Sequence, residues 1–262
     1  MGLGSAAGFQ WKANLANASY DSVSLSVTAQ TTSVKGMAFS EDGTYLFCLN
    51  FGGPLYKYTL STAWDISTAS FTESVNYFRG TSERGLYFSP DGLNFYVVDN
   101  TGDTADRYNI AAAYNLQNSG ETFTDKTGID TVPWGIFLST DGTKMFIAGQ
   151  SGQDITEFSL STAWDVTTAS ETTTFSVSSQ DTEPTGLYFS SDGLYMYVVG
   201  DIGNDINEYS LTTAWDISTA SYVQNFSISS QSINPTAVWF KSDGTKMYVS
   251  DDNGNIYQYS TA

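Results

Sequence analysis

Five Asp-Gly dipeptides at nearly equal spacing are the feature that most limits what this chain can fold into. They stand at Asp42-Gly43, Asp91-Gly92, Asp141-Gly142, Asp192-Gly193 and Asp243-Gly244. Successive pairs are 49 to 51 residues apart, a period typical of propeller blades. Each pair lies between two short apolar runs, as a hairpin turn does. The spacing therefore predicts five copies of one antiparallel unit.

The fourth unit shows the four strands most clearly, and we name them A to D in chain order. They are residues 186–189, 195–199, 205–211 and 222–229. The Asp-Gly turn joins A to B, and a Trp-containing crossover joins C to D. One such sheet cannot bury both of its faces alone, so the units must stack around an axis.

The two ends of the chain supply one blade between them. The fifth unit has strands A, B and C but reaches Ala262 without a strand D, whereas residues 18–27 read like the strand D at 220–228. We therefore predict an all-β, five-bladed propeller with four antiparallel strands per blade. In it Tyr20 to Val27 pairs with residues 256–259, which removes an open sheet edge. Residues 18–262 form the single domain, and residues 1–17 form an N-terminal extension whose Trp11 either replaces a crossover Trp or lies in a loose tail.

The A–B hairpins, such as residues 85–98, resemble the strand pairs of YVTN, NHL and TolB-type propeller repeats. The Leu-Ser-Thr-Ala-Trp-Asp-x-Ser-Thr-Ala-Ser unit resembles repeats of uncharacterised bacteriophage and marine bacterial proteins, including virion-associated ones. The resemblance implies a propeller and carries over no catalytic motif.

Charge and composition exclude several function classes. The net charge is −18, with 10 basic residues against 28 acidic ones and no His. A nucleic-acid backbone or an anionic membrane surface would be repelled. Without His, a Ser or Cys triad is excluded, and so is a metal cluster of His and Cys.

The single Cys48 lies in an apolar strand, so it forms no internal disulfide and is expected in the core. We find no secretory signal and no apolar run of membrane-spanning length. We therefore expect assembly into a virion or a cytoplasmic complex rather than independent secretion.

When the five units are compared with one another, some connecting loops have similar sequences and others have diverged. The A–B turns and C–D crossovers lie on one face, which we call the turn face. The A–B turns keep Asp-Gly throughout, and three C–D crossovers are nearly identical, whereas the copy at 111–119 has diverged, with Tyr114 in place of Trp. The B–C and D–A loops lie on the other, the loop face, and they differ. Loops on a rigid scaffold often carry function, although neutral drift explains the same pattern.

We predict a partner-binding site on the loop face at Phe51, Arg79, Arg84, Arg107 and Trp134, because Arg and aromatic residues dominate interface hot spots. The alternative is that each Arg is paired with a nearby acid.

The crossover residues Trp64, Trp164 and Trp215 have two interpretations. They either stack on sugar rings in equivalent pockets or plug the crossover by packing. In the packing alternative Asp65, Asp165 and Asp216 cap the turn.

Carboxylates and loop oxygens give weaker signals. Glu83, Asp130 and Glu183 occupy comparable D–A positions, where a glycosidase would need paired carboxylates. Asp251, Asn253 and Asn255 alternate as oxygen ligands in a Gly-containing loop, a weak calcium signature.

Our first functional hypothesis is a non-catalytic structural or binding propeller, used as a virion surface, tail or adhesion component. Its loop face would contact a protein partner. A multivalent carbohydrate-binding lectin is the alternative, and a small glycoside hydrolase is the second alternative. Sugar binding at several sites per chain favours the lectin, and hydrolysis that is lost in Glu183→Gln favours the hydrolase.

Overall fold

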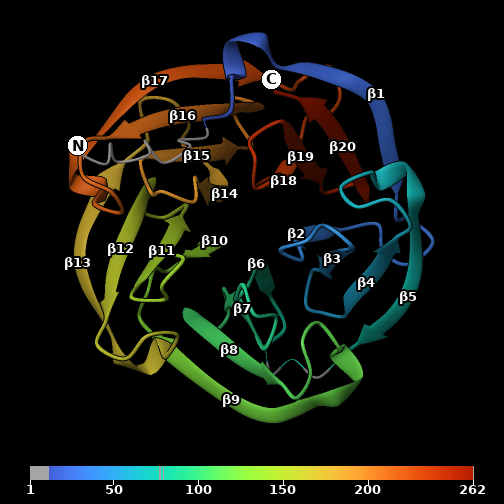
Figure 1. Ribbon diagram of the computed structural model, residues 1–262. Coiled ribbons are helices and arrows are strands. Elements are labelled where there is room, and N and C mark those ends of the chain that lie inside the picture. Colours follow the sequence, from blue (N-terminus) through green and yellow to red (C-terminus); the bar gives the residue numbers. More distant parts are fainter. Residues whose placement is uncertain (1–11, 77, 79, 262) are drawn as a thin grey trace, which may run out of the picture.

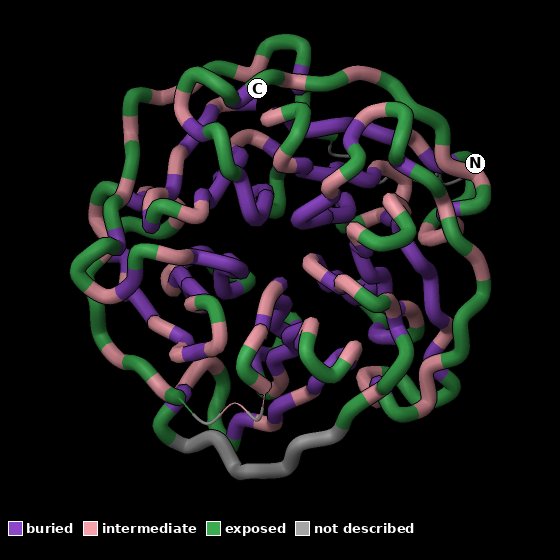
Figure 2. Tube along the Cα trace, turned by 180° about the vertical axis from the view of Figure 1, so that it is seen from behind, coloured by how far each residue is buried: buried purple, intermediate pink, exposed green. Residues whose placement is uncertain are grey.

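Five four-stranded antiparallel sheets stand around one axis, as predicted (Figure 1). The computed structural model describes residues 12–76, 78 and 80–261. In each blade the first strand lies nearest the axis and the last strand forms the rim. The inner strands are buried, whereas the rim strands alternate between exposed and partly buried residues (Figure 2).

The blades take their strands in chain order. The first contains β2 (Val34–Phe39), β3 (Tyr45–Asn50), β4 (Leu55–Leu60) and β5 (Ala69–Val75). The second contains β6 (Glu83–Phe88), β7 (Asn94–Asp99), β8 (Thr104–Ile110) and β9 (Ser119–Thr127). The third contains β10 (Pro133–Leu138), β11 (Lys144–Gly149), β12 (Asp154–Leu160) and β13 (Ala169–Ser176). The fourth contains β14 (Pro184–Phe189), β15 (Tyr195–Gly200), β16 (Asp205–Leu211) and β17 (Ala220–Ser227).

The fifth blade confirms the predicted closure of the ring. It contains β18 (Pro235–Phe240), β19 (Lys246–Asp251), β20 (Asn255–Ser260) and the N-terminal strand β1 (Ser19–Ser26). Tyr20 pairs with Tyr259, and Leu25 pairs with Ile256. The first and last strands therefore lie side by side (Figure 1), and the open edge of the last blade is covered.

The described part of the N-terminal extension, residues 12–17, resembles the crossovers of the other blades. A 3-10 turn, η1 (Leu15–Asn17), precedes β1 just as η2 (Ile66–Thr68), η3 (Leu116–Asn118), η4 (Val166–Thr168) and η5 (Ile217–Thr219) precede the other rim strands. Leu15 is buried like Ile66 and Ile217. Burial of this side chain requires residues 12–17 to act as the fifth crossover. Trp11 lies outside the described residues.

The Asp-Gly turns and the crossovers form one unit on the turn face. The turn glycines have φ between 67° and 71°, a left-handed conformation that glycine adopts without strain. In the fourth blade the amide of Trp215 donates to the carbonyl of Gly193 at 2.9 Å. A Cβ on Gly193 would collide with the Trp215 indole. The turn therefore needs glycine both for its backbone angle and to make room for the aromatic side chain.

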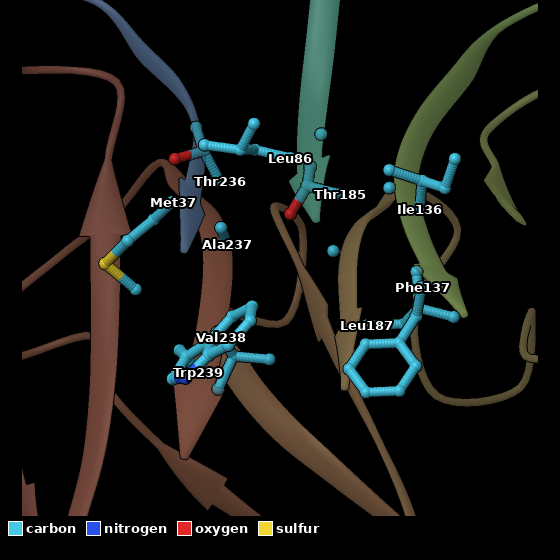
Figure 3. Close-up of a pocket in the computed structure, with 13 residues that line it drawn as sticks. Met37, Leu86, Ile136, Phe137, Thr185, Leu187, Thr236, Ala237, Val238 and Trp239 are labelled. Atoms are coloured by element: carbon cyan, nitrogen blue, oxygen red, sulfur yellow. The ribbon is translucent and has the colours of Figure 1, made fainter. Parts of the chain in front are cut away.

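Close approach of the inner strands narrows the axis to a plug. A Cβ on Gly36 would lie 2.8 Å from the carbonyl carbon of Gly85 in the next blade. The side chains that fill the axis are apolar, and in each inner strand they follow that glycine or its equivalent, Ala237 (Figure 3). They are Met37, Leu86, Ile136, Leu187 and Val238. The plug separates a mouth on the loop face from a mouth on the turn face.

Aromatic stacking joins neighbouring blades around this plug. A ring from the second strand of one blade lies against the last residue of the next inner strand. Ring centroids are 4.2 Å apart for Phe47 and Phe88, and 4.3 Å for Phe146 and Phe189. Cys48 is fully buried, as expected. Among the described residues every helix is a three-residue 3-10 turn, so none has the length or apolar content to cross a membrane.

Candidate functional site at the loop-face mouth

One backbone hydrogen bond, repeated in all five blades, builds the rim of the loop-face mouth. The first residue of each B–C loop donates its amide to a carbonyl in the D–A loop of the same blade. These bonds are Phe51 to Ser33, Asn100 to Ser82, Gln150 to Val132, Asp201 to Glu183 and Asp252 to Asn234, at 3.0 to 3.3 Å. The same frame therefore presents five different side chains to the mouth.

The second residue of each inner strand forms another ring at this mouth. Its members are Lys35, Arg84, Trp134, Thr185 and Thr236. No two neighbours are alike except the two threonines. The identical backbone and the different side chains make this mouth the most diverged part of the repeat.

Two cations flank the indole of Trp134. The guanidinium carbon of Arg84 lies 3.8 Å from the ring centroid, and the ammonium of Lys35 lies 5.0 Å from it. Arg84 also lies 5.5 Å from the ring of Phe51, which is 41% exposed. Cation–π contacts of this kind stabilise by about 0.5–2 kcal/mol.

Lys35 and Arg84 differ in how their charges are satisfied. Lys35 is buried and pairs with Asp252 at 2.6 Å, and Asp252 also accepts from the hydroxyl of Ser33 at 2.6 Å. Arg84 makes no ion pair with any described residue, and its Nε is buried without a hydrogen-bond partner there. Burial lowers the pKa of Arg84, yet a guanidinium stays charged in proteins. No described residue forms a direct ion pair with this cation, and the carboxylates of Asp252 and Asp99 act on it only from a longer distance.

A cavity of about 200 Å³ opens beside these cations. It is lined by Lys35, Trp134, Thr185, Asp201, Asn234, Pro235, Thr236 and Asp252. Burial raises the pKa of Asp201, and the charges of Glu183 and Asp181 add to that effect. Among these lining residues Lys35 of blade 1 is basic, and Asp201 of blade 4 and Asp252 of blade 5 are acidic. We call the cavity together with Arg84 and Phe51 the loop-face site.

The second blade also buries carboxylates behind the loop-face site. Glu83 is 0% exposed, and its carboxylate has no side-chain donor among the described residues. Burial and the nearby charge of Asp99 raise the pKa of Glu83, whereas the nearby backbone amides of Glu83 and Gly80 lower this pKa in part. Burial also raises the pKa of Asp106 to about 7. Val34, Pro133, Pro184 and Pro235 occupy the position of Glu83 in the other blades, so this blade departs from the repeat at a cost in stability.

The structure brings together three of the five predicted partner-binding residues, namely Phe51, Arg84 and Trp134. Arg107 lies apart from these three residues. Its guanidinium donates to the carbonyl of Trp164 at 2.8 Å and to the side chain of Asn109 at 3.1 Å. It lies on β8, whose alternation directs this side chain to the next blade's crossover. Arg79 lies outside the described residues.

The crossover tryptophans have packing contacts. Trp64 stacks on Phe39 with ring centroids 5.3 Å apart, and Trp164 and Trp215 pack against the main core while partly buried. Asp65, Asp165 and Asp216 each accept the backbone amide two residues ahead, which confirms the predicted cap. The geometry supports the packing alternative, and sugar binding at these residues remains an untested prediction.

The predicted carboxylate set does not share one position. Glu83 begins an inner strand, Asp130 accepts the Val132 amide at 2.6 Å three residues before its own inner strand, and Glu183 precedes Pro184. The three residues looked equivalent in the sequence, but they stand at different distances from the start of their inner strands, at Glu83, Pro133 and Pro184. They therefore do not occupy equivalent places in the three blades.

The predicted calcium loop has a simpler explanation. Asp251 is buried, and its Oδ1 accepts the backbone amides of Asn253 and Asn255 at 2.9 and 2.8 Å. The hydroxyl of Tyr257 donates to its other oxygen at 3.1 Å. The pattern therefore closes the loop by hydrogen bonds. No group of three acidic, Cys or His residues in the described ranges has the geometry of a metal site.

Sequence reasoning missed Lys35, Asp201 and Asp252. Lys35 carries a readable signal, since it occupies the inner-strand position of Arg84 and Trp134 when the five units are aligned on their Asp-Gly pairs. The two aspartates carry none in this acidic chain.

Known structures share the architecture at low sequence identity. A functionally unknown protein from Desulfotomaculum acetoxidans matches with a TM-score of 0.51 and 18% identity over 84% of this chain and 62% of its own. A putative 6-phosphogluconolactonase from Bacteroides uniformis has a TM-score of 0.51 and 14% identity over 87% of this chain and 71% of its own. A luciferin-regenerating enzyme has a TM-score of 0.57 and 14% identity over 91% of this chain and 95% of its own. These likenesses show a distant structural similarity to lactonase-type β-propellers and concern the fold alone. No protein-family model matches the chain, and no curated protein matches it.

Proposed function

We propose that this protein is a non-catalytic binding propeller whose loop-face site receives a carboxylate from a protein partner. One observation carries the proposal: Arg84 is a partly buried cation, stacked on Trp134, with no ion pair among the described residues. A buried cation costs free energy unless an anion pairs with it. An acidic side chain of a partner supplies that anion and accepts two parallel hydrogen bonds from the guanidinium.

The rest of the loop-face site suits a short peptide segment. Phe51 is an exposed aromatic residue at the rim, and Trp134 is an anchor of the kind that dominates interface energies. The acidic wall at Asp201 and the hydrogen-bonding side chains of Asn234, Thr185 and Thr236 orient the remainder of the segment. The overall charge of −18 repels acidic partners in general, so binding of one carboxylate at Arg84 is a specific event.

The resemblance of the Trp-containing repeat to virion-associated repeat proteins supports a place on a virion surface or tail, or in adhesion. In such an assembly the turn face, whose turns are similar in every blade, would stabilise the fold, and the loop face would contact the partner. A carbohydrate-bearing partner is the second candidate, because Trp134 stands beside Asn234 and Asp201 in the cavity, and aromatic stacking with polar neighbours also suits a sugar.

A displayed library of random short peptides tests the proposal. We expect selected binders to contain an Asp or Glu whose replacement by Asn or Gln weakens binding about tenfold or more. Arg84→Gln should lose the same binders, whereas Lys241→Gln, which removes a cation from the turn face, should retain them. Binders without an essential acidic residue, or binders that ignore Arg84→Gln, would contradict the proposal. Selective binding of sugars that depends on Trp134 would favour the second candidate.

A further inference from the structure

Four aromatic side chains close the channel at the turn face, opposite the loop-face site. Tyr87, Phe137, Tyr188 and Trp239 occupy the fifth position of their inner strands. Neighbouring rings meet edge to face, with centroids 4.9 Å apart for Tyr87 and Phe137, 5.2 Å for Phe137 and Tyr188, and 5.3 Å for Tyr188 and Trp239. The first blade has Ala38 at this position, and Trp239 reaches across it to within 6.4 Å of Tyr87.

A cavity of about 70 Å³ lies between these rings and the Asp-Gly turns. Besides these four rings it is lined by the rings of Phe39, Phe88, Tyr114 and Phe189. One residue of each A–B turn also lines it, namely Glu41, Pro90, Thr140, Ser191 and Ser242. A single water needs only about 10–15 Å³ of such space, so the cavity has room for a group of several heavy atoms. Glu41 is the one carboxylate among these lining residues.

Tyr114, in the crossover of the second blade, holds the turn that contains Glu41. Tyr114 stands where three other blades have Trp, and unlike Trp it carries a hydroxyl. That hydroxyl donates to the carbonyl of Pro90 at 3.1 Å and accepts the backbone amide of Glu41 at 3.2 Å. The departure from Trp therefore ties the Glu41 turn to the next blade at the edge of the cavity.

The electrostatic surroundings of the cavity are negative. Each of the five blades contributes one turn aspartate to this face. Lys241 is the basic residue of these turns, and it is paired with Asp243 at 2.6 Å. Burial raises the pKa of Tyr188, with the carboxylate of Glu41 as the second cause, which indicates that Glu41 lies near the rings.

We propose that the turn-face cavity binds a small organic cation, a quaternary ammonium head group such as that of choline. Several aromatic rings with a carboxylate at the edge are the arrangement by which proteins bind such groups, because the π faces and the acid both attract a weakly hydrated cation. The volume suits the few heavy atoms of a trimethylammonium group. This site is independent of the carboxylate-binding site that we propose at the loop face.

Titration calorimetry with choline, supported by the fluorescence of Trp239, tests the proposal. We expect choline to bind and its neutral isostere, dimethylbutanol, to bind at least about threefold more weakly, since only the cation interacts with the rings and the acid. Glu41→Gln should weaken choline about two- to fivefold. Glu171→Gln, which removes an equal charge from the exposed rim strand β13, should leave the affinity unchanged.

A second pair of variants avoids disturbing the core. Thr140→Lys places a tethered ammonium at the cavity and should abolish choline binding, whereas Thr140→Gln, of similar length without charge, should retain most of it. Trp239→Leu should weaken choline about three- to thirtyfold. Absence of choline binding to the folded wild-type protein would overturn the proposal, and so would equal binding of choline and dimethylbutanol or equal affinity in Glu41→Gln.

Discussion

Turn aspartates on the turn face and buried carboxylates on the loop face have pKa shifts in opposite directions, whereas the pKa of Glu41, also on the turn face, is raised by burial and by the charge of Asp42. On the turn face, burial alone would raise the pKa of Asp42, but donors from Thr44 and Ser40 outweigh it and the pKa is lowered. Hydroxyl and amide donors lower the pKa of Asp141 in the same way. On the loop face, burial raises the pKa of Glu83, Asp106 and Asp201, and nearby acids add to it.

The difference follows from how the two faces are built. Each Asp-Gly turn satisfies its carboxylate with donors within five residues, so the same solution serves every blade. The loop face uses one backbone frame for unlike side chains, and some of these have no partner in the described fold. Groups that cost stability persist where they serve function, so the contrast points to the loop face as the more specialised side.

The largest expected effect concerns the turn face, where Trp215 and Gly193 form one packing unit. Trp215→Ala should lower the free energy of unfolding by about 3–5 kcal/mol, because a large ring leaves the core. Gly193→Ala should also destabilise, by positive φ and by collision with the indole. Denaturant unfolding of both single variants and the double variant should show a combined loss smaller than the sum.

Gly128→Ala is the matched control for that measurement. Gly128 has φ of 69° but no atom within 4 Å of its Cβ position. It should therefore show only the backbone cost, about 1 kcal/mol. A Gly193→Ala variant no worse than this control would mean that the indole does not determine the turn.

The second effect tests a loop-face carboxylate, Asp106, whose pKa is raised by burial. The pKa of Asp106 rises from 3.8 to about 7 on folding, so the folded state binds the proton more tightly than the unfolded state. Stability should therefore fall as the pH rises between these values and stay reduced above about pH 7. Asp106→Asn should remove this slope and stabilise by on the order of 2–4 kcal/mol above about pH 7.

Unfolding curves over a pH series measure the effect, with Glu171→Gln on the rim strand β13 of another blade as a control. Glu171 is exposed and is not among the groups that raise the pKa of Asp106, so its replacement should leave the slope in place. An unchanged slope in Asp106→Asn would mean that this carboxylate does not distinguish the two faces.

The third effect separates the two arginines of the second blade. Arg107→Ala removes charge-assisted hydrogen bonds to the Trp164 carbonyl and should cost about 1.5–3 kcal/mol. Arg84→Ala removes stacking on Trp134 and should cost about 1 kcal/mol or less, while it abolishes binding of acidic peptides. Melting curves together with the peptide assay compare them. The reverse pattern, with Arg84 stabilising and Arg107 binding, would overturn our assignment.

The smallest effect concerns Asp141 on the turn face, where the dependence of stability on pH has the opposite sign to that of Asp106. The pKa of Asp141 is lowered on folding, so its contribution is present above about pH 4 and is lost as the pH falls through the folded pKa. Asp141→Asn should cost about 1 kcal/mol or less at neutral pH, because the group is exposed and screened. The difference from wild type should shrink in acid. A constant difference at all pH values would show that charge plays no part.

The sequence alone determined the architecture of this protein. The Asp-Gly period set five blades, and the missing last strand required residues 18–27 to close the ring. These features are local and repeated, so each copy confirms the others. The cap at Asp65 was also readable, since a capping carboxylate acts on the backbone two residues away.

Only the tertiary structure decided which side chains meet. Arg84 and Arg107 look equivalent in the sequence, yet one lies at the loop-face mouth and the other holds the next blade's crossover. Lys35 and Trp134, almost a hundred residues apart, become neighbours because inner strands of different blades surround one axis. The cavity behind Tyr87 and Trp239 likewise depends on rings from all five blades. A repeat pattern specifies the contacts within a unit, whereas contacts across the axis are long-range and leave no local signal.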